Sequence, residues 1–103
     1  MSDIKLQSEY LALDKYEYYG DIYYYKKDTG IKHNPYGPAF VSTNGYKEYW
    51  IEDNLYRLDG AAIIYSNGKG FYYINSRELT KEEFELHPER LKFLGKEHLI
   101  CLK

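Results

Sequence analysis

Few residues of this 103-residue chain have the type and spacing that catalysis or metal binding requires. The three histidines, His33, His87 and His98, lie in unrelated local sequences, and none has a partner at a metal-ligand spacing. The single cysteine, Cys101, lies in an apolar run, where a thiol without an adjacent base is typical of a packed core. We therefore predict no catalytic residue, no metal, no cofactor and no enzymatic activity.

Charged residues offer two further candidate sites. The glutamates within residues 82–85 could form a pair of catalytic carboxylates, but acidic residues in the first turn of a helix are also what the helix dipole favours. Lys26 and Lys27, near Lys32, form the only basic cluster, and a turn that exposes lysines is common. Lys26, Lys27 and Arg57 are the candidate phosphate contacts.

Aromatic residues are the unusual feature of the composition. The chain has 14 tyrosines, and 18% of its residues are aromatic, which is more than a core of this size needs. Tyrosine offers a large, rigid contact area at low cost in conformational entropy, so it is favoured in strands and at binding surfaces. Which of these residues could bind a partner depends on the elements that carry them.

The aromatic residues belong to an internal repeat. Residues 37–45 return 23 positions later as residues 60–68, and both segments end in Asn-Gly. The similarity continues beyond the glycines, where residues 49–51 align with residues 72–74. A weaker first copy has Tyr19-Gly20 where the other two copies have Asn-Gly.

Each copy is typical of a β-hairpin. Asn-Gly between β-prone runs predicts a two-residue type I′ turn, because that turn requires a positive φ at both positions and Asn and Gly adopt it readily. The expected strands cover residues 39–43, 46–51, 62–66 and 69–74. We predict a mainly β, α+β fold, an antiparallel meander of repeated β-hairpins with a short helical C-terminal appendage.

The two-residue turn fixes an expected register. The predicted cross-strand pairs are Phe40 with Tyr49, Val41 with Glu48, and Ala39 with Trp50. One predicted face carries Phe40, Tyr49, Ile51, Ile63, Tyr72 and Ile74, and the other carries Val41, Trp50, Ile64, Phe71 and Tyr73. Both faces are apolar, so both should be covered, partly by this chain and partly by something else.

Superposition of the copies stacks aromatic residues in two columns. One column holds Tyr24, Tyr49 and Tyr72, and the other holds Tyr25, Trp50 and Tyr73. A short chain cannot easily cover both faces of such a sheet, so one column should form a homodimer interface or a partner site. The predicted partner-binding residues are Tyr23, Tyr25, Trp50 and Tyr73.

Residues 80–95 predict a capped helical tail. Thr80 and Glu83 have the spacing of a capping box, in which each residue binds the backbone of the other. A second short helix is expected to begin at Pro88 and to end before Gly95.

The chain has the length of one domain, 1–103. A closing strand is expected at residues 97–102, and residues 2–14 fit a helix slightly better than a strand. The hairpin repeats are placed at about residues 15–35, 36–58 and 59–79.

The charge pattern argues against two classes of partner. The formal net charge is −2 and is spread evenly along the chain, so nucleic acid is not expected as a direct ligand. No apolar run approaches the roughly 20 residues that span a bilayer, so no membrane association is expected. The chain start lacks the pattern of an export signal, and a single cysteine cannot form an internal disulfide, so a cytoplasmic location is predicted.

The segment from Asn44-Gly45 to Tyr49-Trp50, followed by residues 56–62, resembles a known repeat type. It is similar to the Asn-Gly, Trp, Arg-x-Asp-Gly-Pro-Ala hairpin repeats of small phage and bacterial proteins related to MORN repeats. The resemblance covers roughly residues 36–84, and Ala61 stands where the family favours proline. It implies a hairpin array that closes with a strand and a capped helix, and it implies no shared catalytic residues.

These observations favour a non-enzymatic binding protein that is encoded by a phage or mobile element. We expect it to dock on a host or defence protein and inhibit it, as an anti-CRISPR or other anti-defence protein does. One alternative is a small-molecule or nucleotide sponge, in which the aromatic columns stack a base while Lys26, Lys27 or Arg57 holds a phosphate. Another alternative is a structural module of a virion or other assembly.

Overall fold

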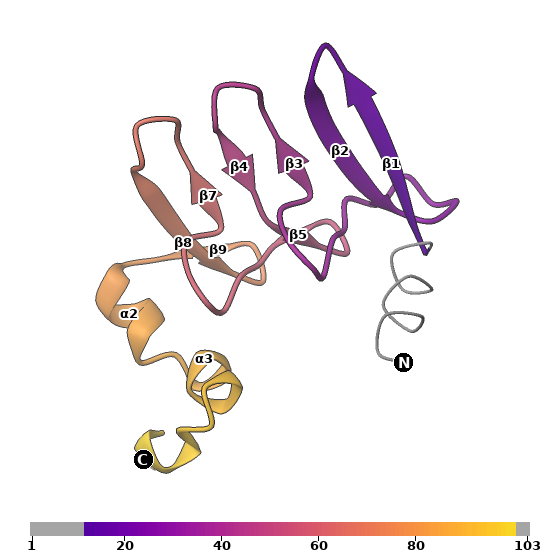
Figure 1. Ribbon diagram of the computed structural model, residues 1–103. Coiled ribbons are helices and arrows are strands. Elements are labelled where there is room, and N and C mark those ends of the chain that lie inside the picture. The colour runs from indigo at the N-terminus through magenta and orange to yellow at the C-terminus, as the bar shows by residue number, and fades with distance from the viewer. Residues whose placement is uncertain (1–11, 101–103) are drawn as a thin grey trace, which may run out of the picture.

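A computed structural model describes residues 12–100, which form a row of β-hairpins followed by short helices (Figure 1). The strands are β1 (Leu13–Tyr18), β2 (Asp21–Lys26), β3 (Phe40–Val41), β4 (Lys47–Glu48), β5 (Trp50–Ile51), β6 (Asn54–Leu55), β7 (Ile63–Ile64), β8 (Gly70–Ile74) and β9 (Arg77–Leu79). The helices are α2 (Lys81–Glu85), α3 (Pro88–Phe93) and the 3-10 helix η1 (Glu97–Leu99).

Seven strands make one antiparallel sheet in the order β1-β2-β3-β4-β7-β8-β9, while β5 pairs with β6. Three hairpins, β1-β2, β3-β4 and β7-β8, stand side by side with their turns at the same end (Figure 1). The predicted fold, mainly β with a short helical C-terminal part, is therefore confirmed.

The first hairpin has a two-residue turn. Tyr18 pairs with Asp21, and both residues between them have a positive φ, 49° at Tyr19 and 85° at Gly20. This is the backbone of a type I′ turn. A Cβ atom on Gly20 would lie 2.6 Å from the methyl carbon of Thr43, so a side chain there would also collide with the next hairpin.

The second and third hairpins have three-residue loops, so the two-residue turns predicted at both Asn-Gly sites are wrong. The N–H of Gly45 donates to the carbonyl of Ser42 (3.0 Å), and the N–H of Ser42 donates to the carbonyl of Tyr46 (2.8 Å). Within this loop only Gly45 has a positive φ (95°), and the Asn44 side chain accepts the N–H of Tyr46 (3.0 Å). The result is a type I turn followed by a glycine bulge, and the loop at residues 66–68 repeats it.

The longer loop shifts the register by one residue. Phe40 pairs with Glu48 and Val41 pairs with Lys47. The predicted pairs that this register replaces are Phe40 with Tyr49, Val41 with Glu48, and Ala39 with Trp50. Because neighbouring residues of a strand point to opposite faces, a shift of one residue changes which side chains share a face.

The observed pairs define two faces of the sheet. The aromatic face carries Tyr16, Tyr23, Tyr25, Phe40, Glu48, Trp50, Ile63, Phe71, Tyr73 and Glu78. The helix face carries Tyr24, Val41, Tyr49, Ile64, Tyr72, Ile74 and Leu79. The two predicted columns do lie on opposite faces, but Phe40 and Ile63 lie with Trp50, and Val41 and Ile64 lie with Tyr49, contrary to the predicted faces.

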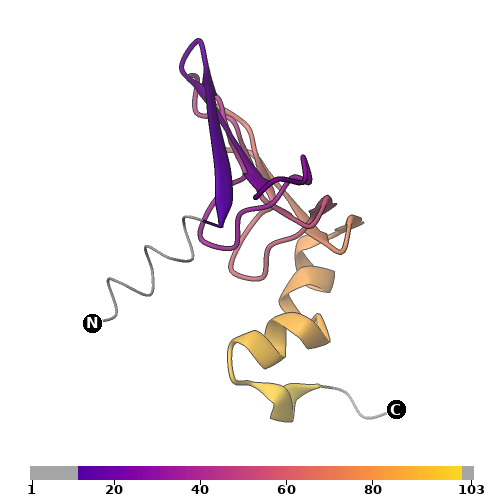
Figure 2. The same ribbon diagram turned by 90° about the vertical axis from the view of Figure 1, so that its right-hand side faces the viewer.

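The buried core lies on the helix face, next to β8 and β9. Phe84 of α2 is 2% exposed, packs with Ile74 and Leu79, and has its ring centroid 4.6 Å from that of Tyr72. Leu91 of α3 is also buried. Figures 1 and 2 show both helices at the end of the sheet away from the three hairpin turns, so they cover only part of this face.

Both helix starts agree with the sequence prediction. The Thr80 hydroxyl accepts the N–H of Glu83 (3.1 Å), and the Glu83 carboxylate accepts the N–H of Thr80 (2.8 Å), which confirms the capping box. Pro88 is the first residue of α3, and Gly95, with a φ of 73°, follows the end of that helix.

The sequence also predicted an element at each end of the chain, a closing strand at residues 97–102 and a helix at residues 2–14. Residues 97–99 form a 3-10 helix rather than the start of a closing strand, because the N–H groups of Leu99 and Ile100 bond to carbonyls three residues earlier. The helix predicted for residues 2–14 falls mostly outside the described residues, and Leu13 and Asp14 belong to β1.

The location of the core predicts the effect of two matched substitutions. We expect Phe84→Ala to lower the free energy of unfolding by about 3–5 kcal/mol, because it removes a buried ring and leaves a cavity. Phe93→Ala in α3 removes a ring that is 58% exposed and should cost far less. Urea denaturation followed by circular dichroism measures both, and equal losses would contradict this location of the core.

Candidate functional site

The most prominent feature of the aromatic face is a row of ring contacts that crosses all three hairpins. The ring centroids lie 4.8 Å apart for Tyr23 and Phe40, 5.9 Å for Phe40 and Tyr46, 5.5 Å for Tyr46 and Tyr65, and 5.3 Å for Tyr65 and Phe71. We call these five residues the aromatic ladder. Such contacts stabilise the sheet by about 0.5–1.5 kcal/mol each, and they also form a continuous stripe on one face.

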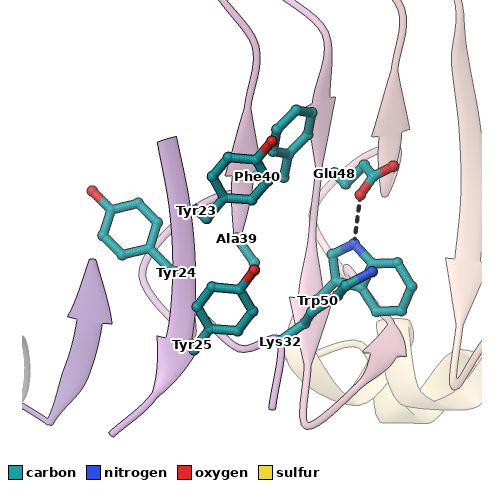
Figure 3. A pocket seen from close by; sticks show the side chains of 8 residues that line it. All are labelled: Tyr23, Tyr24, Tyr25, Lys32, Ala39, Phe40, Glu48 and Trp50. Atoms are coloured by element: carbon teal, nitrogen blue, oxygen red, sulfur yellow. Dashed lines mark hydrogen bonds between the residues drawn. The ribbon is translucent and has the colours of Figure 1, made fainter. Parts of the chain in front are cut away.

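A pocket of about 210 Å³ adjoins the aromatic ladder at the boundary of the first and second hairpins (Figure 3). It is lined by Tyr23, Tyr24, Tyr25, Lys32, Ala39, Phe40, Glu48 and Trp50, and we call it the Trp50 pocket. Aromatic rings form most of its wall, with one carboxylate and one ammonium group among them.

Glu48 anchors the side chains around this pocket. Its carboxylate accepts the Tyr46 hydroxyl (2.6 Å) and the indole N–H of Trp50 (2.9 Å; Figure 3). Burial, and then the hydrogen bond to the Glu48 carboxylate, raises the pKa of Tyr46 well above its ordinary value, so this hydroxyl stays protonated as the donor. The carboxylate therefore fixes the orientation of one ladder ring and of the only tryptophan in the chain.

Lys32 supplies the positive charge of the pocket. Its Nζ atom lies 4.4 Å from the centre of the Trp50 ring, which is a cation–π contact. The backbone of Lys32 is held on one side by a bridge to Tyr25 and on the other by its N–H, which donates to the Asp53 carboxylate (2.7 Å). The segment between the first two hairpins is thereby tied to the edge of the pocket.

The structure brings together three of the four predicted partner-binding residues. Tyr23, Tyr25 and Trp50 line the Trp50 pocket and are half-buried, so Trp50 is not enclosed within the protomer. Tyr73 lies farther along the same face, where its hydroxyl donates to Glu78 (3.0 Å).

Sequence reasoning missed Phe40, Glu48 and Lys32 as residues of this site. Phe40 was missed because the assumed two-residue turn assigned it to the other face, away from Trp50, whereas Glu48 shares the face of Trp50 in either register. The signal was present in the sequence, since Asn-Gly also fits a three-residue loop with glycine in the left-handed position.

The three candidate phosphate contacts do not form one site. Lys26 pairs with Glu52 (2.5 Å), and Lys27 pairs with Asp14 (3.4 Å), both at the exposed end of the first hairpin. Arg57 lies elsewhere, on the helix face of the sheet.

The Arg57 side chain contacts other groups of the protein. Its guanidinium lies 3.9 Å from the centre of the Tyr49 ring, its Nε donates to Asp59 (2.7 Å), and its Nη1 donates to the carbonyl of Ala61 (3.0 Å). It borders a hollow of about 330 Å³ that extends to Phe93 of α3. These contacts hold the connection between the second and third hairpins against the sheet.

The fold and this site together describe a seven-stranded antiparallel sheet of repeated hairpins with a half-buried aromatic face. No protein-family model, no curated protein and no solved structure matches the chain. In residues 12–100, no group of three or more His, Cys, Asp or Glu residues is arranged to hold a metal ion. None of the helices described here has both the length and the apolar character needed to cross a membrane.

The position of Glu48 predicts a specific loss. We expect Glu48→Ala to lower the free energy of unfolding by about 1–3 kcal/mol, because two donors lose a charged acceptor. Trp50 fluorescence should shift to longer wavelength as the released indole becomes more exposed to water. The control Glu78→Ala removes an exposed carboxylate with a single tyrosine donor and should cost less than about 0.5 kcal/mol. If both variants behave alike, Glu48 does not anchor the pocket.

His33 predicts a dependence of stability on pH. Its Nδ1 atom accepts the N–H of Glu52 (3.0 Å). Burial lowers the pKa of this imidazole below its ordinary value of 6.5, Lys26 lowers it further, and the Glu52 carboxylate opposes both. The unfolded chain therefore binds a proton before the folded chain does, so the stability present above pH 6.5 falls as the pH drops below that value.

The variant His33→Asn isolates this effect, because an amide oxygen can accept the same N–H without titrating. We expect the free energy of unfolding to fall more in the native protein than in the variant between about pH 7.5 and pH 5.5, a window above the usual range of carboxylates. Urea denaturation at both pH values measures the difference. Identical pH dependence in the two proteins would show that His33 titrates freely in the folded state.

Proposed function

We propose that this protein is a non-enzymatic binding module that docks on another protein through its aromatic face. The observation that supports this proposal is the aromatic ladder beside the Trp50 pocket on a face that the helices do not cover. Protein interfaces are enriched in tyrosine, tryptophan and arginine, and a few such residues in a central pocket carry most of the binding energy. Trp50, oriented by Glu48, is the proposed centre of the interface.

The size of the Trp50 pocket favours a protein partner over a nucleotide. Its volume is about 210 Å³. Sites for small molecules usually begin at about 300 Å³. A single apolar or aromatic side chain of a partner fits this space better than a base with its sugar and phosphates. The dispersed positions of Lys26, Lys27 and Arg57 also favour a protein over the nucleotide sponge.

The proposed target is a host or defence protein in the cytoplasm, with a CRISPR effector or another immunity effector as the first candidate, and the proposed effect is inhibition. The small size of the chain and its resemblance to the hairpin repeats of phage and bacterial proteins support this choice of target. A structural role in a virion or another assembly would use the same face, and it differs in having no effect on an immune effector.

The test combines capture with inhibition. Tagged protein is incubated with lysates that contain CRISPR and other defence systems, bound proteins are identified by mass spectrometry, and the purified candidate is then assayed for activity with the protein added. Trp50→Ala should weaken binding by at least about tenfold, because loss of a central interface residue costs more than 1–2 kcal/mol. Phe93→Ala, which changes an exposed ring in α3, is the matched aromatic control.

Three outcomes separate the candidate functions. A partner that is lost with Trp50→Ala, kept with Phe93→Ala and inhibited by the native protein supports the proposal. A partner that binds both variants equally contradicts the role of the aromatic face. If no protein binds but a small molecule is released on denaturation and raises the melting temperature when added back, the protein is a sponge instead.

A further inference from the structure

Within the described residues 12–100, β1 is an edge strand of the seven-stranded sheet. It contains six residues, and its one strand partner in this part of the chain is β2. The last four residues of β1, residues 15–18, are exposed. The opposite edge, β9, has three residues and contacts α2. Exposed edge strands of this length present backbone donors and acceptors that can pair with another strand.

The hydrogen bonds of the first hairpin show which backbone groups of β1 point outward. The N–H of Lys27 donates to the carbonyl of Ala12 (3.0 Å), and the N–H of Tyr24 points away from β1, to the carbonyl of Ala39 (2.7 Å). Because donor directions alternate along an antiparallel pair, Leu13, Lys15 and Glu17 direct their N–H and C=O groups away from β2. Of these three residues, Lys15 and Glu17 lie in the exposed part of the strand, so a strand that adds there must bond to them.

We propose that β1 pairs antiparallel with β1 of a second copy of this chain, centred on Tyr16. In this register Lys15 of each copy lies opposite Glu17 of the other, and the Tyr16 residues face each other across the two-fold axis. The outward backbone groups of Lys15 and Glu17 then form about four hydrogen bonds between the copies. Both side chains lack an ion pair or hydrogen bond elsewhere in the described chain, so they are available for these pairs.

Charge complementarity selects this register over its neighbours. The bonding pattern allows only shifts that keep Lys15 and Glu17 among the hydrogen-bonded positions. One neighbouring register places Lys15 opposite the same residue of the second copy, and the other places Glu17 opposite itself. Like charges directly across a pair of strands are destabilising, whereas opposite charges stabilise it. The arrangement centred on Tyr16 is the one that pairs both charges with their opposites.

Charge reversal tests this interface directly. Sedimentation velocity from roughly 10 µM to 1 mM covers the weak affinities expected for a small interface. The native protein should form dimers, and Lys15→Glu or Glu17→Lys should each weaken dimerisation at least about tenfold, because both cross-strand pairs become repulsive. The double variant carrying both changes should dimerise like the native protein. An equal mixture of the two single variants should form heterodimers, since their charges are complementary.

Rescue separates the proposal from simple misfolding. Far-UV circular dichroism and melting temperature verify the fold of each variant. A native protein that stays monomeric at every concentration overturns the proposal. A dimer that the single reversals do not weaken, or that the double variant does not restore, also overturns it.

A disulfide test reads the register independently. In a Cys101→Ser background, Tyr16→Cys places two thiols on directly opposite residues, whose Cα atoms lie about 4.5 Å apart in such a pair, within the range for a disulfide. Oxidation should give a covalent dimer. In the control Tyr18→Cys, the two cysteines are offset by four positions, roughly 13 Å, and should not cross-link. Equal cross-linking of both variants would exclude this register.

Discussion

The three-residue loop at each Asn-Gly site is the constraint on which the rest of the structure depends. The positive φ of Gly45 and the hydrogen bond from the Tyr46 N–H to the Asn44 side chain close a turn that pairs Phe40 with Glu48. With a two-residue turn, Phe40 would lie on the other face of the sheet relative to Glu48. The observed register instead places an aromatic ring, a carboxylate and the indole on one face, so the Trp50 pocket exists because of the loop.

The sheet is a single layer with two apolar faces. The helices α2 and α3 cover part of the helix face, and no helix of the described residues covers the aromatic face. The described residues bury few apolar side chains, namely Ala39, Ala62, Ile74, Leu79, Phe84 and Leu91. The larger ones gather under α2 and α3, where Phe84 meets the third hairpin. Toward the hairpin turns, rings stack on rings along the aromatic ladder instead of packing under a second layer. The aromatic residues that stabilise the sheet therefore remain partly accessible on its surface, because no second layer in the described part of the chain covers them.

The sequence was sufficient for the architecture because its signals were local. The Asn-Gly turns, the capping box of Thr80 and Glu83 and the proline and glycine around α3 each depend on residues a few positions apart. Tyr23, Tyr25 and Trp50, three of the four predicted site residues, line one pocket. The alignment of the repeats placed them on one face, and that alignment does not depend on the type of turn. The cross-strand partners required the loop length, which Asn-Gly leaves open between two and three residues. Lys32 could not be placed at Trp50 because it lies in an irregular connection between hairpins.

The edge and the aromatic face are connected through Tyr16. Its ring centroid lies 5.7 Å from that of Tyr25, which lines the Trp50 pocket, so the contacts of the aromatic face reach the outermost strand. Antiparallel pairing of two β1 strands has its two-fold axis perpendicular to the sheet, which places both aromatic faces on the same side. A partner that itself has two-fold symmetry could then contact both pockets, and the second contact would be intramolecular. Weak pairing through β1 would therefore increase the strength of the proposed binding through Trp50 without adding any contact to the pocket.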